Sequence, residues 1–228
     1  MPGTSESGEY PRHGFQGNRA EMPPERLWPL TISLSRESGS RGESIARRVG
    51  QKLGRQVYTQ DLLEFMATSD DARQALISEL PQDAIDWADD QMKRLRHDQV
   101  LRIESEISDL TYLILLLAVR GESIVVGRGA GYVLPPELML HVRIVAPLPD
   151  RIAYFSQTLR LTREQAAEEV RHRDQRRAEF LASEFRRPSA EPHAFDLFLN
   201  SARLGEELAA ELIINALRGK EALRDQRR

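Results

Sequence analysis

Short apolar segments alternate along the chain with longer segments whose apolar residues recur at helical spacing. The short segments predict strands and the longer ones predict helices. Such an alternation is typical of an α/β domain with a mainly parallel sheet. The predicted strands are Leu30–Leu34, Gln56–Tyr58, Ser123–Gly127, His141–Ala146 and Phe195–Leu199.

The helix after the first strand shows the clearest pattern. Ile45, Val49 and Leu53 form one apolar stripe, and Gly54 stands where a helix-terminating glycine belongs. Residues 60–120 are predicted to be mostly helical, with a break at Pro81, and their length predicts an insertion packed against the sheet. The other predicted helices are Pro149–Leu159, Thr162–Phe185 with a capping box of Thr162 and Gln165, and Gly205–Leu217.

The division of the chain follows from the same pattern. Residues 1–26 are rich in Gly, Pro, Ser and charge without apolar periodicity, which predicts a flexible tail. We expect residues 27–218 to form a single domain, since a chain of 228 residues is long enough for one sizeable core. Within it, residues 60–120 are the helical insertion and 160–187 a lid region, and residues 219–228 are expected to fray.

Composition narrows the function classes. Hydrophobic residues make up 40% of the chain, charged residues 29%, and the net charge is −3, so no strong field recruits nucleic acid or an anionic membrane surface. The longest apolar run, Leu113–Val119, cannot span a bilayer and predicts a buried helix. Cysteine is absent, which excludes disulfides and thiolate catalysis, and no secretory pattern opens the chain. The expected location is the cytoplasm.

The stretch LTISLSRESGSRGESIA, residues 30–46, has the layout of a phosphate-binding loop but lacks its lysine. Gly42 stands at the lysine position, and Lys52 lies roughly 12 Å farther along the predicted helix. Backbone N–H groups and the helix dipole can bind phosphate without a lysine, with Arg36 and Arg41 as candidate cations and Ser44 as a candidate Mg²⁺ ligand. The same letters also fit an exposed turn whose charged residues pair with one another.

Two further segments carry arginines in positions that suit an anionic ligand. Arg128 follows the strand at Ser123–Gly127 among glycines that let a ligand approach the backbone. Arg173 and Arg177 lie one helical turn apart beside Asp174, an arrangement that fits a phosphate lid. A glycine-rich turn and a solvated charged helix are the alternative readings of these two segments.

Taken in order, the motifs resemble the cytidylate kinase-like family, relatives of the nucleoside monophosphate kinases. They read ITISLSRESGSRGESIAR, VYTQDLL, SIVVGRGAGYVL, HVRIVAP, RDQRRAEF and FDLFLNSARLG, and the resemblance covers roughly residues 29–217. It implies a P-loop kinase-like three-layer α/β fold, with a mainly parallel five-stranded sheet, a helical acceptor-binding insertion and an arginine-bearing lid. It also implies Mg²⁺-dependent transfer of the γ-phosphoryl group of ATP to a nucleoside monophosphate, with cytidylate as the first expected acceptor.

The resemblance assigns roles to particular residues. Arg41 is expected to act in place of the lysine, and Arg128, beside Gly129, to hold the acceptor phosphate. Tyr58 and Asp61 are expected to line the acceptor pocket, and Arg173, Asp174 and Arg177 to act from the lid. The phosphate loop would comprise Gly39, Ser40, Arg41, Gly42, Glu43 and Ser44, with Arg36 beside it and Ser44 on the metal.

Three departures from true cytidylate kinases leave alternatives open. Gly42 replaces the loop lysine, Gly129 replaces the acidic residue of the Gly-Arg-Asp motif, and neither central strand ends in a carboxylate for Mg²⁺. The chain could therefore be a nucleotide-binding regulatory module with little turnover, a kinase of a non-nucleotide small molecule, or a scaffold that binds no nucleotide. Apolar faces between Ala84 and Val119 suggest a homodimer, and neither nucleic acid nor membrane is an expected partner.

Overall fold

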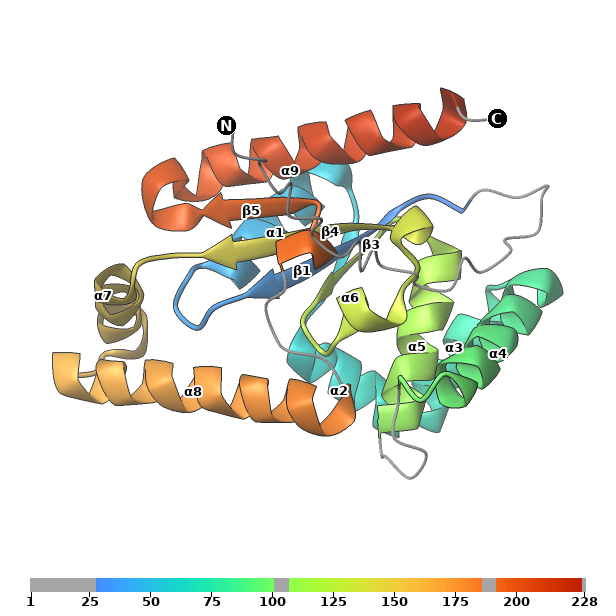
Figure 1. Cartoon of the computed structure of the whole chain (residues 1–228), viewed down its shortest axis with the longest axis horizontal. Helices are drawn as coiled ribbons and strands as arrows, with labels where there is room; N and C mark the ends of the chain where they lie inside the picture. Colours follow the sequence, from blue (N-terminus) through green and yellow to red (C-terminus); the bar gives the residue numbers. More distant parts are fainter. Residues whose placement is uncertain (1–27, 101–106, 186–191, 227–228) are drawn as a thin grey trace, which may run out of the picture.

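A five-stranded sheet forms the centre of the molecule, with helices on both faces (Figure 1). In this computed structural model every pairing is parallel, in the order β2-β3-β1-β4-β5. The predicted α/β class with a five-stranded parallel sheet is therefore confirmed. The strands are β1 (Thr31–Arg36), β2 (Gln56–Tyr58), β3 (Ser123–Val126), β4 (Met139–Val145) and β5 (Leu197–Asn200).

The structure describes residues 28–100, 107–185 and 192–226. The predicted tail at residues 1–26 and the end of the predicted lid region lie outside these ranges. The helices are α1 (Gly42–Leu53), α2 (Gln60–Thr68), α3 (Asp70–Ser78), α4 (Gln82–His97), α5 (Ile107–Arg120), α6 (Ala130–Val133), α7 (Leu148–Leu159), α8 (Arg163–Glu184) and α9 (Ser201–Gln226), with short 3-10 turns η1 (Pro136–Leu138) and η2 (Pro192–Ala194).

The central strand β1 separates an apolar face of the sheet from a polar one. Ile32 and Leu34 are buried on the side covered by α1 and α9, together with apolar residues of β3 and β4. Because side chains alternate along a strand, Ser33 and Ser35 point to the opposite side, where they line a cavity. The strand ends of β1 and β3 meet at one edge, since Leu34 pairs with Val126.

The helical insertion packs as its composition predicts. Helix α5 is buried over Leu113–Val119, and Trp28 meets Trp87 of α4 edge to face at 5.2 Å between ring centres. The apolar faces on which we expected a homodimer, from Ala84 onward, are thus largely buried inside this chain. The homodimer stays a prediction, and these buried faces do not supply its interface.

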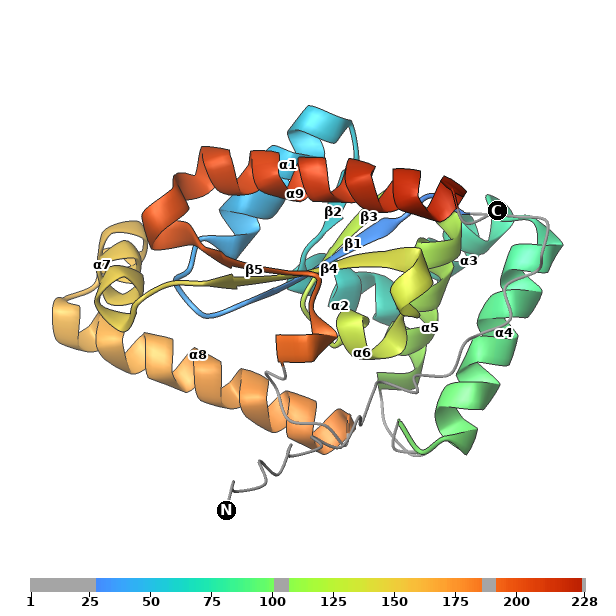
Figure 2. The ribbon, with the colours of Figure 1, turned by 45° about the horizontal axis from the view of Figure 1, so that its top comes forward.

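Helices α7 and α8 form a separate arm on the side of the sheet opposite α9 (Figure 2). The capping box predicted at Thr162 and Gln165 is present, with both hydrogen bonds formed. Phe155, Ala166 and Val170 give the arm a small apolar core of its own. The arm places one face of α8 over the ends of the central strands.

The C-terminal part of the chain differs from its prediction in where its elements begin and end. The last strand begins at Leu197 instead of Phe195, and α9 begins at Ser201 because Asn200 Oδ1 accepts hydrogen bonds from the N–H groups that follow it. Gly205, predicted as the helix start, has a non-helical backbone with φ 70°, so a short first helix from Ser201 meets the main helix at a kink there, close to the predicted start. The segment expected to fray from residue 219 is helical to Gln226, held by ion pairs and hydrogen bonds that Lys220, Glu221 and Arg224 make with distant residues.

No helix within the described residues is long and apolar enough to cross a membrane.

Candidate functional site

A cavity of about 530 Å³ opens at the carboxyl ends of β1 and β3, between the sheet and α8. Of the charged side chains that line it, the two acidic ones are Glu43 and Asp61. The arginines outnumber them, so the cavity suits an anionic ligand. These arginines are Arg36, Arg128, Arg173, Arg176 and Arg177.

The segment between β1 and α1 is a structured loop. Gly39 and Arg41 have left-handed backbones, with φ 80° and φ 60°. Ser40 Oγ donates to the carbonyl of Glu37 at 2.8 Å, and the carbonyl of Ser40 accepts from Ser201 Oγ at 2.8 Å. The first N–H groups of α1, starting at Gly42, have no partner within the helix and are free to bind an anion.

Two residues expected at the phosphates, Arg41 and Ser44, point elsewhere. The Arg41 guanidinium lies 5.1 Å from the centre of the Tyr154 ring, and Arg41 does not line the cavity in the described structure. Ser44 Oγ donates to Glu206 of α9 at 2.5 Å, so its hydroxyl is turned away from a metal on the cavity side. Lys52, excluded from the loop by its spacing, pairs with acidic residues of α9.

Arg36 and Arg128 do reach the cavity. Arg128 has a left-handed backbone with φ 53°, forms an ion pair with Glu64 of α2 and lies 4.8 Å from the Phe180 ring centre. Burial and the neighbouring Arg177 guanidinium lower the pKa of Arg36 to about 9, which still leaves it charged near neutral pH. The two arginines therefore place concentrated positive charge at the strand ends.

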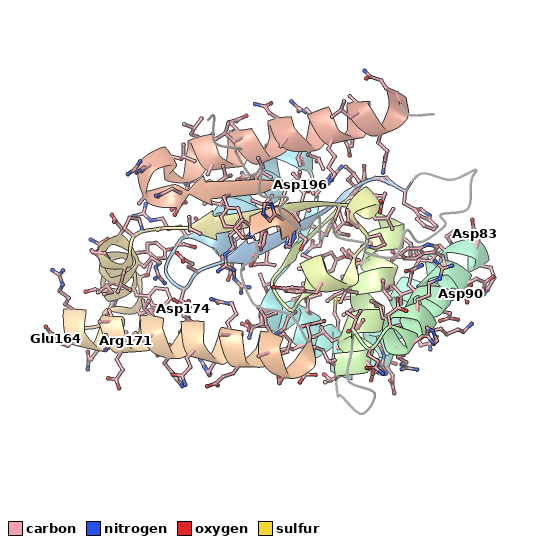
Figure 3. The ribbon with its side chains drawn as sticks, in the orientation of Figure 1. Asp83, Asp90, Glu164, Arg171, Asp174 and Asp196 are labelled. Carbon is pink, nitrogen blue, oxygen red and sulfur yellow. The ribbon has the colours of Figure 1, made fainter. Side chains whose placement is uncertain are left out.

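Helix α8 is docked onto the loop through Asp174. This carboxylate accepts from the Ser38 N–H at 2.8 Å, from Arg151 Nη1 at 2.5 Å and from Arg177 Nη1 at 3.2 Å. Burial opposes its ionisation, yet these donors keep the pKa of Asp174 below its ordinary value. Figure 3 places Asp174 on the side of α8 that faces the sheet. Its oxygens are occupied, so a positioning role suits it better than a metal.

The other arginines of α8 approach the cavity from the same face. Arg177 also donates to Ser38 Oγ at 3.1 Å, which ties it to the loop. Arg173 pairs with Glu169 at 2.5 Å and lies 5.0 Å from the Phe155 ring centre, at the rim. The structure thus brings both expected lid arginines to the cavity, Arg177 in contact with the loop, and adds Arg176, which the sequence analysis did not single out.

Of Tyr58 and Asp61, the two residues expected to line an acceptor pocket, only Asp61 lines the cavity. Asp61 lines it, but Tyr58 is buried in the insertion core and its hydroxyl accepts from Arg120 Nη1 at 2.7 Å. Sequence reasoning missed several lining residues, although the alternation of serines with apolar residues in β1 signalled a polar face. The residues missed include Ser33, Ser35, Tyr132, His141, Phe180 and Phe195.

His141 has its tautomer fixed by the fold. Its Nδ1 lies 2.7 Å from the carbonyl of Ala194, which can only accept, so Nδ1 carries the proton in the neutral ring. Its side chain is 4% exposed and stacks on Phe195 at 4.1 Å between ring centres. Burial lowers the pKa of His141 to about 4. The ring therefore presents a neutral Nε2 acceptor beside Gly131.

His141 should make stability depend on pH. An unfolded histidine binds a proton below its ordinary pKa of 6.5 while the folded ring stays neutral down to about 4, so acid favours unfolding in this window. We expect the free energy of unfolding to fall by up to about 3 kcal/mol between pH 7 and pH 4 through this group. His141→Gln should flatten that slope in urea titrations across the pH range. An unchanged slope would contradict the burial of a neutral ring.

Gly129 leaves no room for the acidic residue that true cytidylate kinases carry there. Its φ is 73°, and a Cβ built on it would overlap the ring of Phe185. Gly129→Ala should cost about 2–5 kcal/mol of unfolding free energy, because backbone strain and overpacking add. Gly54→Ala is the matched control, since Gly54 has φ 69° but no atom near its Cβ position, and should cost about 1–2 kcal/mol. Urea midpoints measure both, and equal costs would remove Phe185 from the explanation.

The described residues contain no group of three or more histidine, aspartate or glutamate side chains placed to hold a metal ion. Glu43 and Asp61 are the acidic residues of the cavity wall. This donor set fits Mg²⁺ carried mainly by phosphate oxygens and water, and not an ion held by protein alone.

Comparison with known proteins gives a family and a fold. A family model described as the cytidylate kinase-like family matches residues 31–203. A crystal structure of an uncharacterized protein from Eubacterium ventriosum is similar at a TM-score of 0.58 and 16% identity, over 83% of this chain and 98% of that one. A crystal structure of a protein from Thermus thermophilus reaches 0.46 and 15%, over 85% and 98%. No curated protein matches the chain. At 16% identity, the likeness to the Eubacterium ventriosum protein shows the fold alone.

Proposed function

The chain belongs to the cytidylate kinase-like family, and from this premise we propose that it transfers the γ-phosphoryl group of ATP to a nucleoside monophosphate. The observation that carries the proposal is the set of five arginines around one cavity at the strand ends, facing two carboxylates. Phosphoryl transfer needs positioning and charge neutralisation more than covalent help from the protein. A cavity of this charge supplies both.

The residues divide the task by position. The N–H groups at the start of α1 and the guanidinium of Arg36 would bind the phosphates of ATP. Arg128 at the end of β3 would bind the acceptor phosphate, and Arg177 on α8 would neutralise charge on the group in transfer. Asp174 holds α8 against the loop and so keeps Arg177 in place. Mg²⁺, bound to the phosphates, would supply further neutralisation.

Cytidylate is the first acceptor to test, because the family is named for it, but the acceptor pocket lacks one feature of that chemistry. Gly129 stands where an acidic residue would bind the cytosine nucleotide, and the Phe185 ring fills the space beside it. His141 and Asp61 offer acceptors for hydrogen bonds from a base or sugar. The panel of acceptors must therefore be broad.

The test is ADP release from ATP and Mg²⁺ in the presence of each ribo- and deoxyribonucleoside monophosphate, against the same mixture without acceptor. Acceptor-dependent release, with the nucleoside diphosphate identified as product, supports the proposal and names the substrate. ATP binding without turnover for any nucleotide would contradict it and favour a nucleotide-binding module or a non-nucleotide acceptor.

A further inference from the structure

The side chain of Arg36 occupies space that two glycines leave open. A Cβ at Gly42, the first residue of α1, would lie 2.7 Å from Arg36 Cβ, and one at Gly127 would overlap Arg36 Nη1. Gly127 has a left-handed backbone that favours glycine in any case, but Gly42 has none. Glycine at position 42 therefore leaves room for the side chain of Arg36.

The guanidinium of Arg36 sits among like charges. Arg177 acts on it most strongly, Arg128 and Arg143 add to the repulsion, and Glu43 opposes it. Among the described residues, none accepts a hydrogen bond from this guanidinium or forms an ion pair with it, although it lines the cavity. A partly buried cation that no carboxylate of the described residues pairs with directly is unfavourable, and a phosphate anion in the cavity would compensate it.

The position of Arg36 matches the task of the missing lysine. Position 42 is where a phosphate loop carries its lysine, and Arg36 reaches the region above the loop from the strand end instead of from the helix. The other loop cation, Arg41, lies over Tyr154. Of these two arginines, Arg36 is thus the one that faces both the start of α1 and Arg128.

We propose that Arg36 replaces the phosphate-loop lysine, and that Gly42 is glycine because the Arg36 stem fills the volume of a side chain there. The inference rests on the proposed phosphoryl transfer. In that step the bond between the γ-phosphorus and the β–γ bridging oxygen breaks, and its electron pair leaves with ADP. A bond forms between the γ-phosphorus and an anionic oxygen of the acceptor phosphate. Arg36 binds the oxygens of the group in transfer, with no change in its own protonation.

The experiment exchanges the two positions. Arg36→Gln, which keeps a polar side chain but removes the charge and the guanidinium, should lower acceptor-dependent ADP release about 100-fold or more. Gly42→Lys alone should also lose most activity, because its stem meets Arg36 Cβ. The double variant Arg36→Gly with Gly42→Lys should recover at least about 10-fold over Arg36→Gly alone, since the cation returns from the helix side. Circular dichroism confirms that each variant is folded.

The outcomes separate this inference from the proposed function. Equal turnover of Arg36→Gln and the parent would overturn the role of Arg36 while leaving the kinase intact. If the double variant is folded and no better than Arg36→Gly, the exchange with position 42 is wrong. If the parent turns over no acceptor, calorimetry with ATP decides: binding at least about 10-fold weaker in Arg36→Gln supports the cation site, and equal affinity refutes it.

Discussion

Arg128→Ala is expected to lower acceptor-dependent ADP release by about 100-fold or more, because it removes the cation placed to bind the acceptor phosphate. The effect should be concentrated in the KM of the acceptor and in kcat, while the KM of ATP changes little. The activity of Arg128→Lys should lie between those of the parent and of Arg128→Ala, since lysine keeps the charge but loses the planar fork of donors. Steady-state kinetics with each substrate varied in turn measures kcat, the KM of the acceptor and the KM of ATP.

Two controls make this result specific to the cavity. Arg163→Ala removes the same charge from an exposed position at the start of α8, outside the cavity wall, and should leave kinetics within about twofold. Glu64→Gln removes the ion-pair partner of Arg128 without touching the arginine itself. A rise in the KM of ATP equal to that of the acceptor would show that Arg128 binds both nucleotides, against the assignment made above.

Arg177→Ala should lower kcat by about 100- to 1000-fold with ATP affinity much less affected, because Arg177 faces the centre of the positive cluster and is positioned by Ser38 and Asp174. Single-turnover measurements separate this loss in the chemical step from slow product release. Arg171→Ala provides the matched control on the same helix, since Arg171 is exposed and does not line the cavity.

Arg177 also ties α8 to the loop, so its loss could act through docking alone. Asp174→Asn tests that route, because it weakens the contact between α8 and Ser38 while leaving both lid arginines charged. A loss in Asp174→Asn as large as in Arg177→Ala would mean that lid docking, and not the Arg177 charge, limits turnover. A clearly smaller loss supports direct neutralisation of the transferred group.

The sequence predicted which segments carry the cavity arginines, but it did not predict where their side chains point. Arg128 was expected at a strand end and Arg177 on a lid helix, and both lie at the cavity. Arg41 was expected at the phosphates, yet its left-handed backbone starts α1 so that the guanidinium meets Tyr154, a residue over 100 positions away. No sequence pattern near Arg41 predicts its contact with Tyr154.

The order of the elements was fixed by local signals. Apolar runs, helical stripes and caps depend on neighbours in the chain, so the strands, the helix that follows the first strand and the capping box at Thr162 could all be predicted. The end of α9 could not, because Lys220 and Arg224 are held by Asp196 and by the carbonyl of Trp28 across the fold. Figure 3 shows Asp196 at this contact, below α9.

The amino-acid sequence by itself determined the α/β class, the parallel sheet, the family and the segments that bear arginine. The tertiary structure alone decided which arginines converge, that Arg36 fills the space left by Gly42, that Asp174 docks α8 onto the loop, and that burial lowers the pKa of His141. The physical reason is one of range. Backbone periodicity and capping are set by residues a turn apart, whereas the direction and charge of a side chain are set by burial and by contacts that only folding brings together.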